Sequence, residues 1–265
     1  MLVVSFNNEK GGCGKSTTTI HMARAASQQG KKVLILDLDP QGNTTSAISK
    51  NELAEDVAGV ADVITPNDPM QLSEIIVPTV WDGVDLAPTP SDLPLKTVLN
   101  LLTVMQLGSE SRVKEALEGL PADAYDLVLI DCPPASNKLT VNAMAAADQV
   151  VVVTEPGFWS IKGIDMVLDS LSLVKKFVNP DVKFAGILVS RYDKRIGNHA
   201  EYHRQIKEHG QILGVKIFDP AIPLLDAVGN GAAEGLPLDE NKSERIRTVG
   251  KSYARFVREL MKEEK

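Results

Sequence analysis

The chain has 265 residues, enough for one large α/β domain or two small domains. Hydrophobic residues make up 43% and charged residues 24%, close to the average for globular proteins, which excludes a chain disordered throughout. The net charge of −7 excludes binding to nucleic acid by overall charge, so any DNA binding requires a local basic patch.

The composition also bears on the cellular compartment. Two cysteines, Cys13 and Cys132, are too few for a disulfide framework and favour a reducing environment. Every apolar run is shorter than the ~18 residues of a membrane span. The N-terminus enters an apolar strand directly, without the basic segment and cleavage site of an export signal. We therefore expect a cytoplasmic protein without a transmembrane segment.

Short apolar runs alternate along the chain with longer helical patterns. The runs that predict strands are 2–6, 33–38, 127–130, 150–154, 184–189 and 215–218. The segments that predict helices between them are 15–29, 95–120, 161–177 and 200–208. Several strands are apolar at consecutive positions, as in parallel sheets that are buried on both faces. The alternation predicts an α/β fold: a doubly wound, mostly parallel sheet with helices on both faces.

Two further segments complete the chain. Residues 54–94 contain six prolines, so we expect loops, short helices and one short strand near 84–86. Residues 243–262 place apolar side chains on one helical face and arginines and lysines on the other, which predicts a docking helix. The chain shows no repeat, low-complexity tract or long linker, so we expect residues 1–265 to form a single domain.

A glycine-rich loop follows the first predicted strand and opens the first predicted helix, the context that a phosphate-binding loop requires. It consists of Lys10, Gly11, Gly12, Cys13, Gly14, Lys15, Ser16 and Thr17. Glycines let backbone N–H groups approach phosphate oxygens closely, and the helix N-terminus adds the positive end of its dipole. We expect Lys15 to contact the β- and γ-phosphates of ATP, Ser16 to ligate Mg²⁺, and Thr17 to donate to the α-phosphate.

Acidic residues follow two other predicted strands. Asp37 and Asp39 lie at the carboxyl end of the second strand, where parallel sheets place metal and water chemistry. Their alternate spacing puts both carboxylates on one face of the strand, unless the turn at Pro40 alters it. The run 127–130 ends at Asp131, a Walker B arrangement that would hold Mg²⁺ through a water or through Ser16. A solvated acidic turn is the alternative for the first pair.

Together these elements resemble the deviant Walker A ATPases of the ParA/MinD family, which are of the P-loop NTPase type. The resemblance rests on KGGCGKST at 10–17, DLDPQGN at 37–43 and IDCPP at 130–134, and it runs through nearly the whole chain. A plain Walker A pattern would need its first glycine at Glu9, whereas this chain has a second lysine, Lys10, before the paired glycines. The DPQGN form looks like ParA rather than MinD, in the short form without an N-terminal DNA-reading domain.

The resemblance implies an ATP hydrolase that is weak alone, dimerises with ATP sandwiched between subunits, and is stimulated by a ParB-like or other adaptor protein. Lys10 matches the signature lysine, which reaches the partner's phosphates. Asp39 matches the switch aspartate linked to positioning the attacking water, and Asp131 matches the Walker B aspartate. Pro223, in the Ile-Pro segment of the family, is expected beside the nucleotide.

The resemblance further implies non-specific DNA binding on the nucleoid through local basic residues. Arg195 matches a basic family position, and candidates in the last segment are Lys242, Arg245, Arg247 and Lys251. The chain departs from the pattern directly after Pro223, because it has Leu224, Leu225 and Asp226 where many relatives carry arginines. Any DNA-binding patch must therefore be built differently here.

Two alternatives stay open at the sequence level. The amphipathic last segment also suits a MinD-like switch that enters membranes with its terminal helix. The other alternative is a metabolic or metal-cluster relative that uses ATP for chemistry. Cys13 and Cys132 both belong to the predicted ATP site, so the cysteines that a cluster would need are missing, which argues against a metal-cluster relative. The cargo of a partition ATPase, whether plasmid, chromosome or protein assembly, is open as well.

Overall fold

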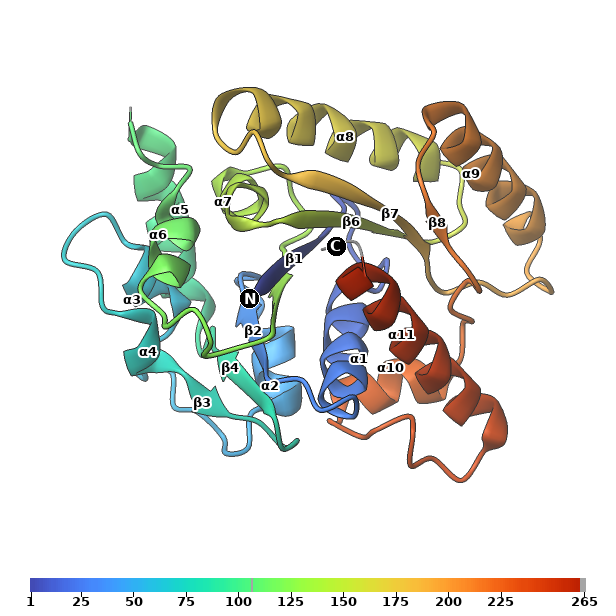
Figure 1. Cartoon of the computed structure of the whole chain (residues 1–265), viewed down its shortest axis with the longest axis horizontal. Coiled ribbons are helices and arrows are strands. Elements are labelled where there is room, and N and C mark those ends of the chain that lie inside the picture. The colour runs from blue at the N-terminus through green and yellow to red at the C-terminus, as the bar shows by residue number, and fades with distance from the viewer. Residues whose placement is uncertain (106, 263–265) are drawn as a thin grey trace.

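The computed structural model describes residues 1–105 and 107–262. Within these residues the strands form one eight-stranded sheet in the order β3-β4-β2-β5-β1-β6-β7-β8 (Figure 1). The strands are β1 (Leu2–Asn7), β2 (Val33–Asp37), β3 (Val77–Pro78), β4 (Val84–Ala87), β5 (Leu127–Asp131), β6 (Gln149–Thr154), β7 (Lys183–Val189) and β8 (Ile217–Phe218). All neighbours pair in parallel except β3 with β4. The predicted doubly wound, mostly parallel sheet is confirmed.

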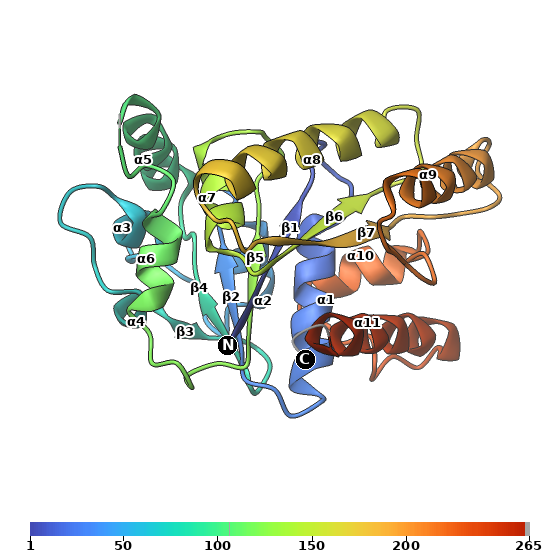
Figure 2. The same cartoon turned by 45° about the horizontal axis from the view of Figure 1, so that its top comes forward.

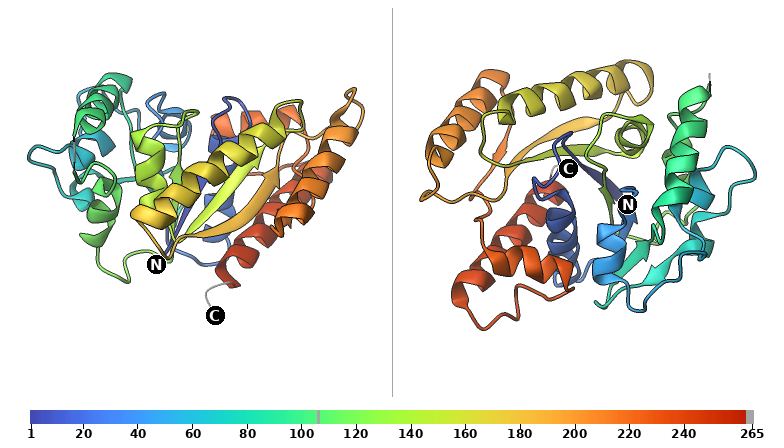
Figure 3. Two further views of the ribbon diagram at one scale, coloured as in Figure 1. Left: turned by 90° about the horizontal axis from the view of Figure 1, so that it is seen from above. Right: turned by 180° about the vertical axis from the view of Figure 1, so that it is seen from behind.

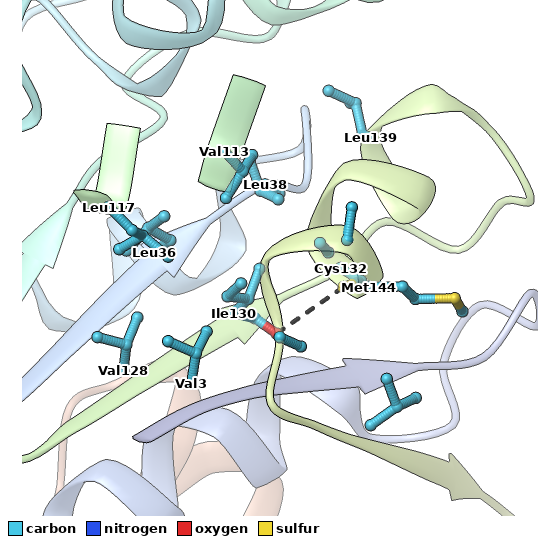
Figure 4. Close-up of a cluster of buried hydrophobic side chains, with 14 of the residues drawn as sticks. Val3, Leu36, Leu38, Val113, Leu117, Val128, Ile130, Cys132, Leu139 and Met144 are labelled. Carbon is cyan, nitrogen blue, oxygen red and sulfur yellow. Dashed lines mark hydrogen bonds between the residues drawn. The ribbon is translucent and has the colours of Figure 1, made fainter. Parts of the chain in front are cut away.

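The central strands are buried on both faces, as their consecutive apolar residues predict. Every residue of β1, β2, β5 and β6 is buried. Alternate side chains of each strand enter two separate hydrophobic clusters, so that Val3 packs in one and Val4 in the other. Figure 4 shows part of the first cluster, to which β5 contributes Val128 beside Val3 and Ile130 further along the strand.

Helices cover both faces of the sheet, and each set closes one cluster (Figure 2). The first cluster is covered by α3 (Val60–Ile64), α4 (Leu72–Ile75), α5 (Asp92–Val104), α6 (Arg112–Glu118), α7 (Lys138–Ala146), α8 (Ser160–Phe177) and α9 (His199–Leu213). The second cluster is covered by α1 (Lys15–Ser27), α2 (Asn43–Ile48), α10 (Asp226–Ala233) and α11 (Glu244–Lys262).

The expectation of one helix over 95–120 is wrong. The structure divides this segment into α5 and α6, with a connection that contains Gly108 at φ 72°. The helix α5 ends at Val104, because its C-cap residue Met105 has an extended backbone (φ −66°, ψ 137°), and the left-handed Gly108 then turns the connection. The expectation for the preceding segment is confirmed, because residues 54–94 form loops, short helices and the short strands β3 and β4.

The predicted docking of the last helix is confirmed. Figure 3 shows α11 beside α1, and its buried side chains include Tyr253 and Phe256 in the second cluster. Phe256 also makes an edge-on contact with Phe218 of β8, with ring centroids 5.5 Å apart. The apolar face that a membrane-binding helix would use therefore lies inside the protein core. No described helix is long and apolar enough to cross a bilayer.

Candidate functional site

The candidate site lies at the carboxyl edge of the sheet, where β1, β2 and β5 end at the same level. Asp131 closes β5 and is in register with Phe6 of β1 on one side and with Asp37 of β2 on the other. The glycine-rich loop leaves β1 at this level and enters α1. Parallel pairing therefore brings the loop and the acidic residues together, as the sequence predicts.

Two glycines give the loop its shape. Gly12 and Gly14 have φ values of 73° and 91°, which side chains rarely adopt. A Cβ atom on Gly14 would also lie 2.7 Å from the Ser190 Oγ atom. That hydroxyl donates a hydrogen bond to the carbonyl of Cys13, which ties the loop to the end of β7. The loop is thus held as a curved backbone that leads from β1 into α1.

The two lysines of the loop occupy different places. Lys15 is buried, and its Nζ donates to the carbonyl of Lys10 across the loop at 3.1 Å. Lys10 has a side chain that is 49% exposed, and its Nζ lies 2.6 Å from Glu155 Oε1. The same carboxylate forms an ion pair with Arg191, whose Nε lies 3.3 Å from Oε2. One lysine therefore lies inside the loop, and the other lies in an ion-pair network at the surface.

A cavity of about 470 Å³ opens over the loop. Seven residues that the sequence analysis assigned to the site line this cavity: Gly11, Gly12, Gly14, Lys15, Ser16, Thr17 and Asp39. An adjoining cavity of about 190 Å³ shares Gly14 and Thr17 with it and contains Pro223. Cys13 is buried behind the loop, with its Sγ 3.3 Å from the carbonyl oxygen of Lys10. The two cavities together give room for phosphates over the loop and for a base beside Pro223.

Asp131 is fully buried between two hydroxyl-bearing segments. Its Oδ2 accepts from Thr44 Oγ1 at 2.7 Å, whereas Oδ1 makes no hydrogen bond to any described residue. Burial raises the pKa of this carboxyl to about 6, against the lowering effect of the Thr44 and Ser16 hydroxyls. A buried carboxylate oxygen without a partner, close to a serine hydroxyl, has the chemistry of a Mg²⁺ site that is reached through Ser16 or a water.

Asp37 and Asp39 have different surroundings, which corrects the expectation that they share one face. Asp37 is buried in the sheet, and Oδ2 accepts from both the backbone N–H and the hydroxyl of Thr45. Burial and the nearby Asp131 raise its pKa to about 8. Asp39 instead lines the cavity and accepts from the N–H of Gln41 at 3.0 Å. The chain leaves the strand after Asp37, so the alternation of side chains no longer applies.

Arg191 is a site residue that the sequence analysis missed. It lines both cavities, and its φ of 55° is uncommon for a residue with a side chain. Glu155, its partner, follows β6 directly. Both residues come immediately after or near the carboxyl ends of strands, and that position was the signal that could have identified them.

Four of the DNA-binding candidates lie in α11 or in the segment before it, and Arg195 lies between β7 and α9. Arg195 is exposed and pairs with Asp193, Nη2 to Oδ2 at 2.6 Å; this bond and the nearby Arg245 hold the pKa of Asp193 well below its usual range. Arg247 donates to two backbone carbonyls before the helix, so it anchors the helix start. The exposed basic residues of α11 and of the segment before it, three of them not foreseen, are Lys242, Arg245, Lys251, Arg255, Arg258 and Lys262. We call these six residues the basic face of α11.

Comparisons with known proteins agree with this geometry. A family model described as "AAA domain" matches residues 1–184. The chromosome partitioning protein ParA of Myxococcus xanthus is 32% identical over 262 residues, which cover 98% of this chain and 88% of that protein. The chain belongs to the ParA family of partition ATPases.

One further relative and one solved structure are similar to this ParA-family chain. The sporulation initiation inhibitor protein Soj of Bacillus subtilis is 30% identical over 236 residues, 89% of each chain. A crystal structure titled cobyrinic acid a,c-diamide synthase from Mycobacterium smegmatis, with a bound ATP analogue and magnesium, is 31% identical with a TM-score of 0.74. It covers 89% of this chain and 92% of that one. Among the described residues of the ParA-family chain, no group of three or more acidic, histidine or cysteine side chains could hold a metal by itself.

Proposed function

We propose that this ParA-family chain is an ATP-driven dimerisation switch that positions plasmid, chromosome or other cargo in the cytoplasm, on the nucleoid. ATP binding joins two subunits, the dimer binds DNA without sequence preference, and a ParB-like or other adaptor stimulates hydrolysis. Because ATP shifts an equilibrium only between states that bind it differently, the two states are a monomer and an ATP-bound dimer.

The observation that carries the proposal is the separation of the two loop lysines. Lys15 lies inside the loop and is available only to the phosphates of its own subunit. Lys10 lies at the exposed rim, and its charge is balanced by Glu155. A cation at the mouth of a phosphate site suits a second nucleotide-bound subunit facing it, because two ATP molecules bring dense negative charge to the interface. Lys10 of the partner subunit would then neutralise the phosphates in this subunit.

The site accounts for hydrolysis of ATP to ADP and phosphate. The amides of the loop and Lys15 hold the phosphates, and Ser16 with Asp131 would hold Mg²⁺. When bound, the metal neutralises charge on the β- and γ-phosphates. Asp39 faces the cavity with one oxygen engaged by Gln41, which leaves the other to orient a water in line with the γ-phosphate. The water oxygen bonds to the γ-phosphorus as the bond to the β–γ bridging oxygen breaks. The bridging oxygen leaves with ADP, and a proton of the water passes to the released phosphate.

The basic face of α11 makes the contact with DNA, because this chain lacks the arginines that many relatives carry directly after Pro223. Four of its side chains, Lys251, Arg255, Arg258 and Lys262, recur at the three- and four-residue spacing of one helix face, opposite the face that packs on α1. Lys242 and Arg245 lie at the start of the helix. Arg195 lies near Arg245, since both act on Asp193. These positive charges stand out against a net charge of −7 and suit the phosphate backbone of DNA.

The proposal is tested by retention on non-specific duplex DNA with ATP, ADP or no nucleotide, across a salt series. We expect retention with ATP only, with a steep decline as salt rises, because phosphate contacts release counterions. Lys10→Ala should abolish DNA retention because it prevents the ATP-dependent dimer from forming. The double variant Arg245→Glu with Lys251→Glu should abolish DNA retention but still dimerise. Glu substitutions at Lys175 and Lys176 on α8 provide a charge-matched control. Absence of retention at low salt by a dimerising protein would contradict the DNA part.

A further inference from the structure

Two neighbouring aromatic side chains are exposed beside the candidate site. Phe158 is 70% exposed and Trp159 is 62% exposed, at the start of α8. Their rings meet edge to face, with centroids 4.7 Å apart and planes at 87°. Such a geometry is favourable for aromatic pairs, so each ring restrains the other before any partner binds. A large apolar surface that is held in place and left open to water indicates a contact surface.

The aromatic pair lies at the same edge of the sheet as the exposed lysine of the loop. It follows Glu155, which pairs with Lys10, by three and four residues. A Cβ atom on Gly157 would lie 3.9 Å from the Lys10 Nζ atom. The connection is also fixed in shape, because Ser160 Oγ accepts from the N–H of Gly157 and donates to the carbonyl of Glu155 at 2.5 Å.

We propose that Phe158 and Trp159 form an apolar contact with a second copy of this chain in the ATP-bound dimer. This inference rests on the proposed dimer, which the two aromatic side chains would stabilise. Its occupant is a second copy because the pair adjoins the one loop side chain, Lys10, that the proposal assigns to the partner's nucleotide. Two subunits that approach closely enough for Lys10 to reach the opposite phosphates must cover the surface next to it.

The energetic role of the pair differs from that of Lys10. Lys10 makes dimerisation depend on ATP, but an exposed charge contributes little affinity before the phosphates arrive. Phenylalanine and tryptophan bury ~150–250 Å² each in an interface, and tryptophan is enriched among the residues that dominate binding. In a two-fold dimer every residue acts twice, so one pair per subunit adds two apolar contacts.

The other end of the same helix provides a matched comparison. Phe177, at the C-terminus of α8, is also 70% exposed. A lysine ammonium lies near each aromatic group: Lys162 at 5.7 Å from the Trp159 ring and Lys176 at 4.9 Å from the Phe177 ring. A helix of 18 residues places the two ends about 27 Å apart. Phe177 thus has the same exposure and chemistry but lies at the opposite edge of the sheet.

The test is the dimer dissociation constant with a non-hydrolysable ATP analogue, measured by sedimentation velocity on the full chain. We expect Phe158→Ala with Trp159→Ala to raise this constant at least about ten-fold, in the range of interface hot spots. The affinity of the monomer for nucleotide, measured below the dimer concentration range, should not change. Trp159→Phe should keep most of the dimer affinity, and Phe177→Ala should dimerise like the unaltered protein.

Tryptophan fluorescence gives a second readout. The chain has two tryptophans, and Trp81 is already buried, so the difference between the unaltered protein and Trp159→Phe isolates Trp159. We expect its emission to shift to shorter wavelength when ATP forms the dimer. A dimer with unshifted Trp159 emission, or an alanine double variant with unchanged affinity, overturns the inference alone. An unaltered protein that stays monomeric with the analogue contradicts the proposed function, and the inference falls with it.

Discussion

At the scale of single residues, the site contains charged side chains that are free to bind a nucleotide or a metal ion in place of their present contacts. Lys10 and Arg191 share one carboxylate, Glu155, at the rim of the cavity, although both lie where phosphates are expected. Asp131 keeps one buried oxygen without a described partner. Ion pairs at the rim are exposed and exchange at little cost, so ligand phosphates can compete for the cations.

The first prediction concerns this shared carboxylate. Glu155→Gln removes the charge from which Lys10 must separate when it turns to a phosphate of the other subunit. We expect an ATP-dependent dimer dissociation constant that is lower by about two- to 30-fold, since an exposed ion pair contributes ~0.2–1 kcal/mol and the dimer contains two such pairs. Sedimentation velocity with an ATP analogue measures it. Glu110→Gln is the control, because Glu110 pairs with Lys138 at similar exposure. A weaker or unchanged dimer in Glu155→Gln would show that the pair does not restrain Lys10.

His21 gives a prediction on pH. Burial lowers its pKa to about 4, although its ring bonds to the carbonyl of Val228. The folded protein therefore holds His21 neutral, while the unfolded chain takes up a proton below pH ~6.5, so this contribution is complete above that pH and is lost as pH falls towards 4. Between pH 6.5 and 5 we expect a loss of about 2 kcal/mol.

The measurement is the free energy of unfolding by urea at both pH values. His21→Gln should remove this part of the decline, so that the variant's stability changes less with pH than that of the unaltered protein. The two tryptophans provide the unfolding signal. Equal slopes for the two proteins would show that His21 is protonated to the same extent in the folded and unfolded chain.

At the scale of elements, α11 has two faces with different tasks. Its apolar face closes the second hydrophobic cluster against α1, and its basic face is open to solvent. This division follows from the helical period of the sequence, which is why the docking of α11 could be predicted. The same reasoning failed for 95–120, because apolar residues on both sides of Gly108 were assigned to one helix although Gly108, Ser109 and Ser111 mark a break.

The packing of α11 leads to a stability prediction. Phe256 is fully buried beside Phe218 and Tyr253, so Phe256→Ala leaves a cavity in the second cluster. We expect the free energy of unfolding to fall by about 3–5 kcal/mol. Phe177→Ala should change it by less than about 0.5 kcal/mol, because that ring is exposed. Full stability of Phe256→Ala together with loss of vesicle binding would instead favour the membrane alternative.

At the scale of the whole molecule, the sheet explains which parts of the site could be predicted. The loop, Asp39 and Asp131 are recognised because each follows an apolar run, and parallel strands gather their carboxyl ends at one edge. Arg191 and Glu155 lie at the same edge but carry no local motif, so only the three-dimensional arrangement joins them to Lys10. Short helices such as α2 and α10 were missed because too few residues show a period.

The whole-molecule view also separates the two proposed surfaces. The phosphate loop, Lys10 and the aromatic pair share the carboxyl edge, where the proposed second copy binds. The basic face of α11 belongs to the helix layer on one side of the sheet. A dimer that covers the edge therefore leaves that helix layer accessible, and two copies of the basic face can act on one DNA molecule.

The central claim, that Lys10 acts on the nucleotide of the other subunit, is tested most directly by mixing two inactive variants. Lys10→Ala keeps an intact cavity but supplies no lysine, whereas Asp39→Ala supplies Lys10 but lacks the residue that orients water. In a mixed dimer the Lys10→Ala subunit receives Lys10 from its partner. At equal concentrations we expect ATP hydrolysis at up to about half of the unaltered rate, since the Lys10→Ala subunits pair only with the other variant and each mixed dimer has one complete site of two. A mixture as inactive as either variant alone, despite mixed dimers, would show that Lys10 serves its own subunit.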